Sequence, residues 1–200
     1  MNAQKFSGVI FDLDETLLTA NIDFAAIRNK IGCEKGKDIL EHVNAFSDPQ
    51  QKEDAHAFIR EEELKDAHSA QWIPGAKAFV NQLHENGIPT AIVTRNSAEA
   101  TKVKLENNQV PIDLVLTREH APAKPDPTAL LDIASRWDLT PPSIAYVGDY
   151  VYDVLAANNA KMHACLFLRR EKEAYSALAD FVFEDYRQLE AYVLGYVAPL

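Results

Sequence analysis

The sequence predicts an α/β fold: a Rossmann-like parallel sheet with helices on both faces, plus a small all-helical cap inserted after the first strand. Two observations predict it. From residue 73 onward, short apolar runs alternate with helical segments of about ten residues, which is typical of βαβ units. From Thr19 to about Gln71, charged and apolar residues mix at helical spacing without a strand-like run. We therefore expect a core domain of residues 1–18 and 73–200 and a cap domain of residues 19–72.

Composition limits the classes of partner. The chain has 200 residues, of which 47% are hydrophobic and 25% charged, and this suits one ordinary domain with a modest insertion. Its net charge of −10 disfavours nucleic acid and anionic membranes as partners. The chain begins without an apolar signal region and has no stretch long enough to span a membrane, so we expect a cytoplasmic protein. A monomer and a homodimer both remain open.

The first predicted strand ends in two carboxylates. Residues 9–11 form an apolar run without a polar break, which is typical of a buried strand. Asp12 and Asp14 follow two residues apart, so both side chains leave on the same face if the extended conformation persists. Two acids that close repel each other unless a cation lies between them or one holds a proton. An isolated Asp-x-Asp is most simply a solvated turn, but this one lies between an apolar strand and Thr16.

The remaining elements follow from periodicity and from the residues that start and stop helices. Asp48 and Pro49 predict the start of a long charged helix. The helices expected in the cap are 22–32, 39–46 and 48–70. The elements expected in the core are helix 74–86, strand 89–94, helix 97–107, strand 113–116, helix 127–137, strand 144–147, helix 151–159, strand 163–168, helix 171–178, strand 180–183 and helix 186–194.

Polar residues stand where these strands end. The second strand leads to Thr94, the loop after the third contains Lys124, and the fourth leads to Asp149, with Asp153 four residues on. Taken singly, Thr94 could cap a helix, Lys124 could be a loop lysine and Asp149 could be part of a turn. Ligands, however, collect at the carboxyl ends of parallel strands, and these residues should meet there with Asp12.

This order of residues resembles the four motifs of the haloacid dehalogenase superfamily, a group of mostly Mg²⁺-dependent phosphohydrolases. The motifs are Asp-x-Asp-x-Thr from Asp12, then Thr94, Lys124 and Gly148-Asp149. The resemblance runs from Val9 to Asp153. The insertion is similar to the helical cap of the phosphoglycolate phosphatase-like and β-phosphoglucomutase-like branches, in a short version. Such caps close over the core, exclude water and choose the substrate.

The resemblance implies a catalytic role for four residues. Asp12 would be the nucleophile, forming an aspartyl phosphate that divides a hard displacement into two easier ones. Asp14 would protonate the leaving oxygen and later deprotonate the attacking water. Thr94 would donate a hydrogen bond to the phosphoryl group, and Lys124 would hold the nucleophile and neutralise phosphoryl charge.

The resemblance also implies a Mg²⁺ site. Asp12, the backbone carbonyl of Asp14 and Asp149 would bind the ion directly. Asp153 would bind it through water or support the site from behind. Mg²⁺ is the expected ion because these ligands are hard oxygens and the substrate phosphate can fill a remaining position.

Two residues depart from the superfamily pattern, and both bear only on the substrate. Glu15 stands where many relatives carry glycine, and Arg95 follows Thr94 where asparagine is common. Arg95 could bind an anionic leaving group at the mouth of the site, or it could be a solvent-facing arginine at a helix start. Basic cap residues that could face the site, or equally belong to solvated helical faces, are Arg28, Lys35, Lys37, His56, Arg60 and His68.

The function expected from the sequence is a Mg²⁺-dependent phosphatase that acts on a small phosphorylated metabolite. A phosphomutase of the β-phosphoglucomutase type would also keep Asp14 and is not excluded. A dehalogenase is disfavoured, since its chemistry needs neither Asp14 nor a metal ligand at Asp149. A non-catalytic phosphate-binding or regulatory module remains a further alternative, because receiver domains combine an acidic pocket, a hydroxyl and a lysine on a parallel sheet. They are shorter, however, and have no cap.

Overall fold

The computed structural model describes residues 6–168 and 174–195, and in these ranges it has one six-stranded sheet with the order β3-β2-β1-β4-β5-β6. Every pair of neighbouring strands is parallel. The strands are β1 Gly8–Phe11, β2 Thr90–Val93, β3 Leu114–Leu116, β4 Ile144–Gly148, β5 His163–Phe167 and β6 Phe181–Phe183. Since β1 lies between β2 and β4, the three strand ends that carry most of the predicted site residues are adjacent.

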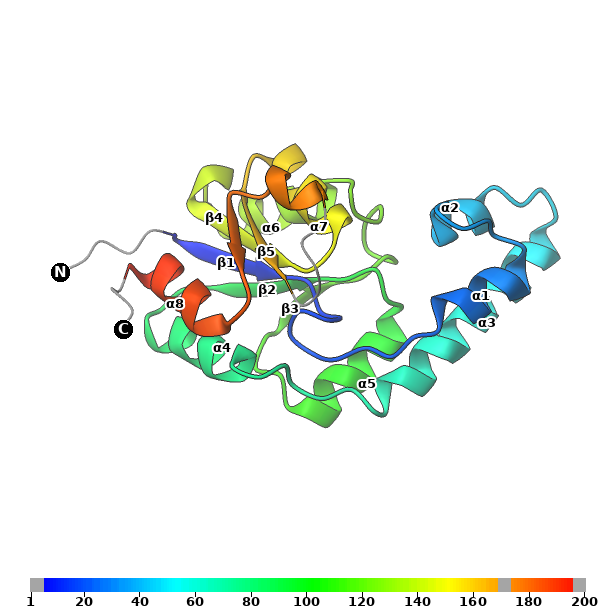
Figure 1. Ribbon diagram of the computed structural model, residues 1–200, viewed down its shortest axis with the longest axis horizontal. Coiled ribbons are helices and arrows are strands. Elements are labelled where there is room, and N and C mark those ends of the chain that lie inside the picture. The colour runs from blue at the N-terminus through cyan, green and yellow to red at the C-terminus, as the bar shows by residue number, and fades with distance from the viewer. Residues whose placement is uncertain (1–5, 169–173, 196–200) are drawn as a thin grey trace.

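Helices cover both faces of the sheet, which confirms the predicted fold class (Figure 1). Helices α4, α5 and α8 lie on one side and α6 and α7 on the other. These helices are α4 Ala76–Glu85, α5 Ala98–Asn108, α6 Thr128–Arg136, α7 Val151–Ala160 and α8 Tyr186–Leu194. No helix in the described part of the chain is long and apolar enough to cross a membrane.

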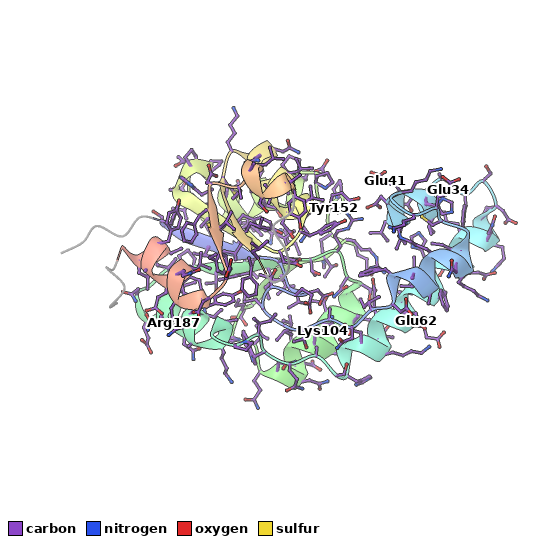
Figure 2. The ribbon with its side chains drawn as sticks, viewed as in Figure 1. Glu34, Glu41, Glu62, Lys104, Tyr152 and Arg187 are labelled. Atoms are coloured by element: carbon purple, nitrogen blue, oxygen red, sulfur yellow. The ribbon has the colours of Figure 1, made fainter. Side chains whose placement is uncertain are left out.

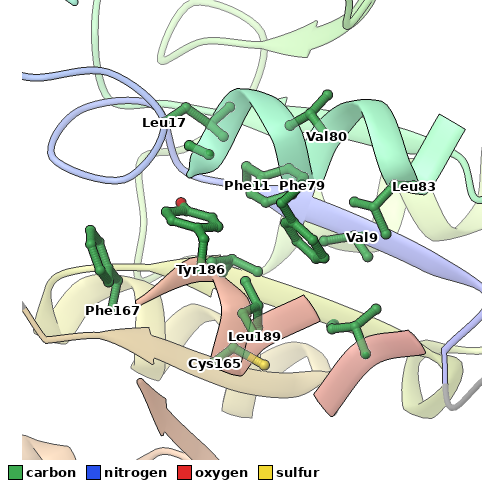
Figure 3. Packing of buried hydrophobic residues seen from close by; sticks show 14 of the residues in the cluster. Val9, Phe11, Leu17, Phe79, Val80, Leu83, Cys165, Phe167, Tyr186 and Leu189 are labelled. Carbon is green, nitrogen blue, oxygen red and sulfur yellow. The ribbon is translucent and has the colours of Figure 1, made fainter. Parts of the chain in front are cut away.

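Alternation along β1 divides the core between the two faces of the sheet. Val9 and Phe11 point toward α4 and α8, whereas Ile10 belongs to the hydrophobic cluster on the opposite face. Figure 3 shows the first of these clusters, in which Phe79 of α4 lies beside Phe11. Tyr186 of α8 is a buried member of this cluster, and its hydroxyl donates a hydrogen bond of 2.8 Å to the Thr16 carbonyl. The last helix is therefore packed directly against the loop that follows β1.

Three helices separate β1 from α4, as the sequence predicts. They are α1 Phe24–Ile31, α2 Ile39–Asn44 and α3 Pro49–Ala67. Each begins at an aspartate whose carboxylate accepts a backbone N–H of the first turn, and these caps are Asp23, Asp38 and Asp48. The helices have a small hydrophobic cluster of their own, centred on Ile27, Val43, Ala55 and Ile59. We refer to residues 19–72 as the insertion.

The chain enters and leaves the insertion along two segments that run side by side. The Thr19 amide donates to the Gln71 carbonyl at 2.8 Å, and the Ile73 amide donates to the Leu17 carbonyl at 2.9 Å. Leu18 and Trp72 form an antiparallel bridge between these two bonds. Both ends of the insertion are thus fixed next to the loop that follows β1.

One predicted helix differs in kind. The sequence predicts a helix over residues 171–178, but the described part, η2 Ala174–Leu178, is a 3-10 helix, and residues 171–173 lie outside the described residues. The segment must turn at once into β6, since the Asp180 amide already donates to the Ala164 carbonyl on β5. Such short connections favour the tighter 3-10 geometry. A second 3-10 turn, η1 Pro141–Ser143, precedes β4.

Candidate active site

Lys124 lies at the centre of the candidate site. Its ammonium donates to Asp12 Oδ1 at 2.5 Å, to Asp153 Oδ1 at 2.7 Å and to the Val93 carbonyl at 3.1 Å. These partners come from the ends of β1 and β2 and from the first turn of α7. The Asp12 amide continues the sheet by donating to the Val147 carbonyl, so its side chain leaves at the strand tip. The structure therefore brings three sequence-predicted residues into direct contact.

Asp153 is held in place by a second set of donors. The Tyr146 hydroxyl donates to its Oδ1 at 3.0 Å and the Tyr150 amide donates to its Oδ2 at 3.0 Å. With Lys124 on Oδ1 as well, both oxygens are occupied. Gly148 allows this approach, because a Cβ atom there would lie 2.3 Å from the Asp153 side chain. These contacts suit a residue that holds Lys124 in position and is itself held by Tyr146 and Tyr150.

Asp12, Asp149 and Asp153 form an acidic cluster in which one carboxylate oxygen from each lies within 4.8 Å of the others. Burial and, to a smaller extent, the charges of Asp153 and Asp12 together raise the pKa of Asp149 to about 9, against the opposing effect of Lys124. The pKa of Asp12 is raised to about 7, because burial outweighs the opposing effect of the Lys124 ammonium. The raised pKa values indicate that the protein's own cations do not fully neutralise the Asp12 and Asp149 carboxylates.

These residues fit a hard divalent cation such as Mg²⁺. The donors are carboxylate oxygens, which such ions prefer, and they converge from two neighbouring strand ends and α7. Within the described residues the Asp149 carboxylate has no hydrogen-bond or ion-pair partner, although Asp12 and Asp153 do. A cation bound there would relieve the repulsion among the three acids.

Asp14 faces a different set of partners from Asp12. Lys104 of α5 donates to its Oδ1, and the Asn96 side-chain amide donates to its Oδ2 at 2.9 Å. Burial raises the pKa of the Asp14 carboxyl, and the contacts with Lys104 and Asn96 offset part of that rise. The Asp14 carboxylate does not belong to the acidic cluster of Asp12, Asp149 and Asp153.

Thr94 lies at the end of β2 and is 4% exposed. Its amide donates to the Leu116 carbonyl, which continues the pairing of β2 with β3 by one residue. Its hydroxyl oxygen accepts the Asn96 amide at 3.1 Å, so the hydroxyl proton remains available to donate. The hydroxyl is therefore suited to bind an anionic oxygen.

The sequence left open whether Arg95 faces solvent, and in the structure its side chain is only 23% exposed. It pairs with Asp38 of the insertion at 2.5 Å, donates to the Lys124 carbonyl at 2.7 Å and lies 4.6 Å from the centre of the Tyr152 ring. Two guanidinium nitrogens thus donate hydrogen bonds, and the guanidinium group also lies against the Tyr152 ring. Arg95 therefore connects the insertion with the loop that carries Lys124.

The basic cap residues considered above pair mostly within the insertion. Arg28 donates to the Glu34 and Lys37 carbonyls, and Arg60 pairs with Glu53. The remaining contacts of this kind are Lys37 with Glu34 and His56 with Asn44. These residues shape the insertion and its surface.

Acidic residues of the insertion, which sequence reasoning overlooked, contact the core instead. On α3, Glu63 accepts the Ser97 amide at 3.2 Å and pairs with Arg118, while Asp66 pairs with Lys104 at 2.6 Å. A signal for them is present in the sequence. Glu63 and Asp66 continue the buried face of α3 begun by Ala55 and Ile59, so they stand where apolar residues are expected.

The structure explains how a glutamate is accommodated at position 15, where many relatives carry glycine. The φ angle of Glu15 is +56°, in the left-handed region that glycine adopts without strain. The glutamate side chain adds a bond that glycine cannot make, since its Oε1 accepts the Ala20 amide at 2.7 Å. The residue thus helps to fix the start of the insertion.

The fold and the site define a class: an α/β protein with acidic, lysine and hydroxyl groups gathered at the carboxyl ends of a parallel sheet. Residues 9–167 match the haloacid dehalogenase-like hydrolase family. The chain belongs to that family of hydrolases, which confirms the family resemblance of its motifs.

Individual relatives agree with this assignment. A haloacid dehalogenase-like hydrolase domain-containing protein of Arabidopsis thaliana is 32% identical over 174 residues, which cover 81% of this chain and 71% of the relative. A phosphoglycolate phosphatase of Cereibacter sphaeroides is 27% identical over 192 residues, covering 84% and 87% of the two chains. A haloacid dehalogenase-like hydrolase structure from Bacteroides fragilis has a TM-score of 0.77 at 21% identity and covers 92% of this chain and all of its own. This last likeness supports the fold alone.

Proposed function

We propose that the protein is a Mg²⁺-dependent phosphatase that hydrolyses a small phosphorylated compound through an aspartyl phosphate on Asp12. The observation that carries the proposal is the contact of the Lys124 ammonium with Asp12 at 2.5 Å, beside the acidic cluster with Asp149. This arrangement suits a carboxylate nucleophile next to a cation site. The phosphoglycolate phosphatase relative supports the same class of substrate.

In the first step, an Asp12 carboxylate oxygen would form a bond to phosphorus while the bond from phosphorus to the ester oxygen breaks. Asp14 would give its proton to that oxygen, which leaves as an alcohol. In the second step, water would attack phosphorus and give a proton to Asp14, and the bond from the Asp12 oxygen to phosphorus would break. Inorganic phosphate leaves, and both side chains return to their starting state.

The other groups would stabilise charge on the phosphoryl oxygens. Asp12 and Asp153 raise the pKa of the buried Lys124 against the effect of burial, so its ammonium stays charged near neutral pH. The Thr94 hydroxyl would donate to a phosphoryl oxygen. A bound Mg²⁺ would supply further positive charge and fix the geometry of the transferring group, with Asp12, Asp149 and the Asp14 carbonyl as ligands.

We also propose that the chain is divided into a catalytic core and a cap. Residues 1–18 and 73–200 would form the catalytic core, and the insertion would be the cap that selects the leaving group. Its separate hydrophobic cluster and its contacts to Arg95 and Lys104 near the site support this division. The small substrate, the absence of nucleic-acid and membrane partners and a cytoplasmic location remain predictions from the sequence.

The direct test is hydrolysis of 4-nitrophenyl phosphate by the wild type and by Asp12→Asn, each with Mg²⁺ and with a chelator. We expect turnover that requires both Mg²⁺ and Asp12. Trapping of a covalent phosphate by acid quenching should succeed in the wild type only. A folded, Mg²⁺-loaded wild type that shows no hydrolysis would overturn the general phosphatase, and transfer between sugar phosphates would then favour the mutase.

A further inference from the structure

Lys104 is a buried cation that the proposed mechanism does not use. Its side chain on α5 is 0% exposed, and Figure 2 labels the residue on that helix. A lysine this deeply buried is costly unless its charge is paired. The ammonium contacts two carboxylates, those of Asp14 and Asp66. Both carboxylates raise the pKa of Lys104 against burial, so it remains an ammonium.

On one side, Lys104 fixes the orientation of Asp14. It donates to Oδ1, while the side-chain amide of Asn96 donates to Oδ2 at 2.9 Å. Donors at both oxygens, from different elements, hold the plane of the carboxylate and limit its rotation. Efficient proton transfer requires such placement, because displacement of the catalytic group by about 1 Å costs up to 100-fold in rate.

On the other side, Lys104 contacts the point where the insertion joins the core. Asp66 lies in the last turn of α3, with Oδ2 2.6 Å from the ammonium. Its Oδ1 accepts the Asn21 amide at 2.6 Å, and Asn21 belongs to the segment that leads into the insertion. The same lysine therefore links Asp14 to the entry segment and to the end of the longest helix of the insertion.

We propose that Lys104 is a positioning residue, which holds the Asp14 carboxylate in its proton-transfer orientation and makes that orientation depend on the placement of the insertion through Asp66. The inference rests on the proposed function of Asp14. Lys104 acts only through Asp14 and is not itself a catalytic residue. The insertion would thereby influence the acid as well as select the substrate.

The test uses two substrates that differ in their need for an acid. Phenyl phosphate has a far more basic leaving oxygen than 4-nitrophenyl phosphate, so its departure depends more on protonation by Asp14. In the Mg²⁺-loaded enzyme, Lys104→Met should lower kcat/KM for phenyl phosphate about tenfold more than for 4-nitrophenyl phosphate. A purely structural loss would lower both equally. Lys102→Met is the matched control, since Lys102 lies on the same helix with its side chain 74% exposed.

A second variant keeps the inference testable if Lys104→Met fails to fold. Asp66→Asn retains an oxygen for the Asn21 amide but removes one of the two charges that hold Lys104. It should change the ratio of the two kcat/KM values in the same direction, by about threefold. An unchanged ratio in the folded variants of an active enzyme would overturn the inference alone. An inactive wild type would overturn the proposed function and this inference with it.

Discussion

Arg95 and Asp38 form an ion pair of 2.5 Å between the end of β2 and the first residue before α2. Both side chains are mostly buried, with 23% and 10% of their areas exposed. The Tyr152 ring covers the guanidinium from the side of α7. This pair holds the far end of the insertion against the mouth of the candidate site.

Replacing Asp38 by Asn should loosen the insertion. The variant removes a charge-assisted hydrogen bond between partly buried groups, and we expect a loss of about 1–2 kcal/mol in the free energy that keeps the insertion docked. Hydrogen exchange of the α1 and α2 amides should accelerate while that of the sheet does not. Asp54→Asn, which alters an exposed acid on α3 bonded to Gln50, is the control. Equal exchange in wild type and Asp38→Asn would contradict this account.

The contribution of Asp38 should also depend on pH. Burial raises its pKa, but the Glu41 amide and Arg95 outweigh that effect and lower it overall. A carboxyl whose pKa is lower in the folded state stabilises that state above its unfolded pKa of about 3.9, and loses this effect as the pH falls through the folded pKa. The difference in exchange between wild type and Asp38→Asn should therefore be full near neutral pH, begin to fall near about pH 4 and vanish only below the lower pKa of the folded state. A difference that persists in acid would exclude an ionic origin.

Mg²⁺ should stabilise the protein more at higher pH. Without a metal, the pKa of Asp149 is about 9, so at neutral pH this carboxyl holds a proton that the ion must displace. The rise in Tm on adding Mg²⁺ should consequently be larger at about pH 8 than at about pH 6. Asp149→Asn should remove most of the rise at both values. A rise that is independent of pH, or that survives this substitution, would place the ion elsewhere.

Gly148→Ala should disturb the site through Asp153. The added methyl group would lie 2.3 Å from the Asp153 side chain, which must move away from Lys124. We expect a stability loss of about 1–3 kcal/mol and a marked fall in kcat, measured by urea unfolding and by phosphatase assay. Gly87→Ala at the end of α4 tests the specificity of the effect, since that glycine has open space around it and only its backbone angle resists substitution. Full activity of Gly148→Ala would show that Asp153 is free to move.

Tyr146→Phe should separate support of Asp153 from catalysis. The substitution removes the hydrogen bond of 3.0 Å to Asp153 and a longer contact of 3.5 Å to the Val93 carbonyl. It leaves the bonds to Asp153 from Lys124 and the Tyr150 amide. A loss of about 1 kcal/mol in unfolding free energy is expected, with a small decrease in kcat and an unchanged KM. Urea titration and steady-state kinetics measure these quantities. Abolished activity would mean that the tyrosine hydroxyl takes part in the reaction.

The sequence predicts the sheet and most helices well because their signals are local. Apolar runs such as Ile144–Val147 and caps such as Asp48 determine their elements with little help from the rest of the chain. The segment at η2 was predicted less well, since its tight geometry is set by where β6 must begin. Strand order explains why the strand-end residues meet, and parallel topology was predictable from the alternation of elements.

The surroundings of the site were less predictable. Lys124 and the acidic cluster meet as the motifs indicate, but the partners of Asp14 do not follow from any motif. From the sequence alone, Lys104 is expected to be an exposed lysine, because its burial depends on the packing of α3 against α5. From the sequence, basic residues of the cap are the candidates to reach the core, whereas in the structure anions such as Glu63 do so. Pairings across distant segments depend on tertiary contacts that periodicity does not contain.

The neighbouring ends of the insertion have a consequence for how relatives of this protein can diverge. Because Thr19 and Gln71 are joined by a backbone hydrogen bond, the positions of β1 and α4 do not depend on how many residues lie between them. The closure cost of that excursion also grows only slowly with its length. Helices can thus be added, lost or exchanged there without shifting β1, and a chimaera that carries another relative's insertion on this sheet is a practical way to test whether the insertion selects the substrate.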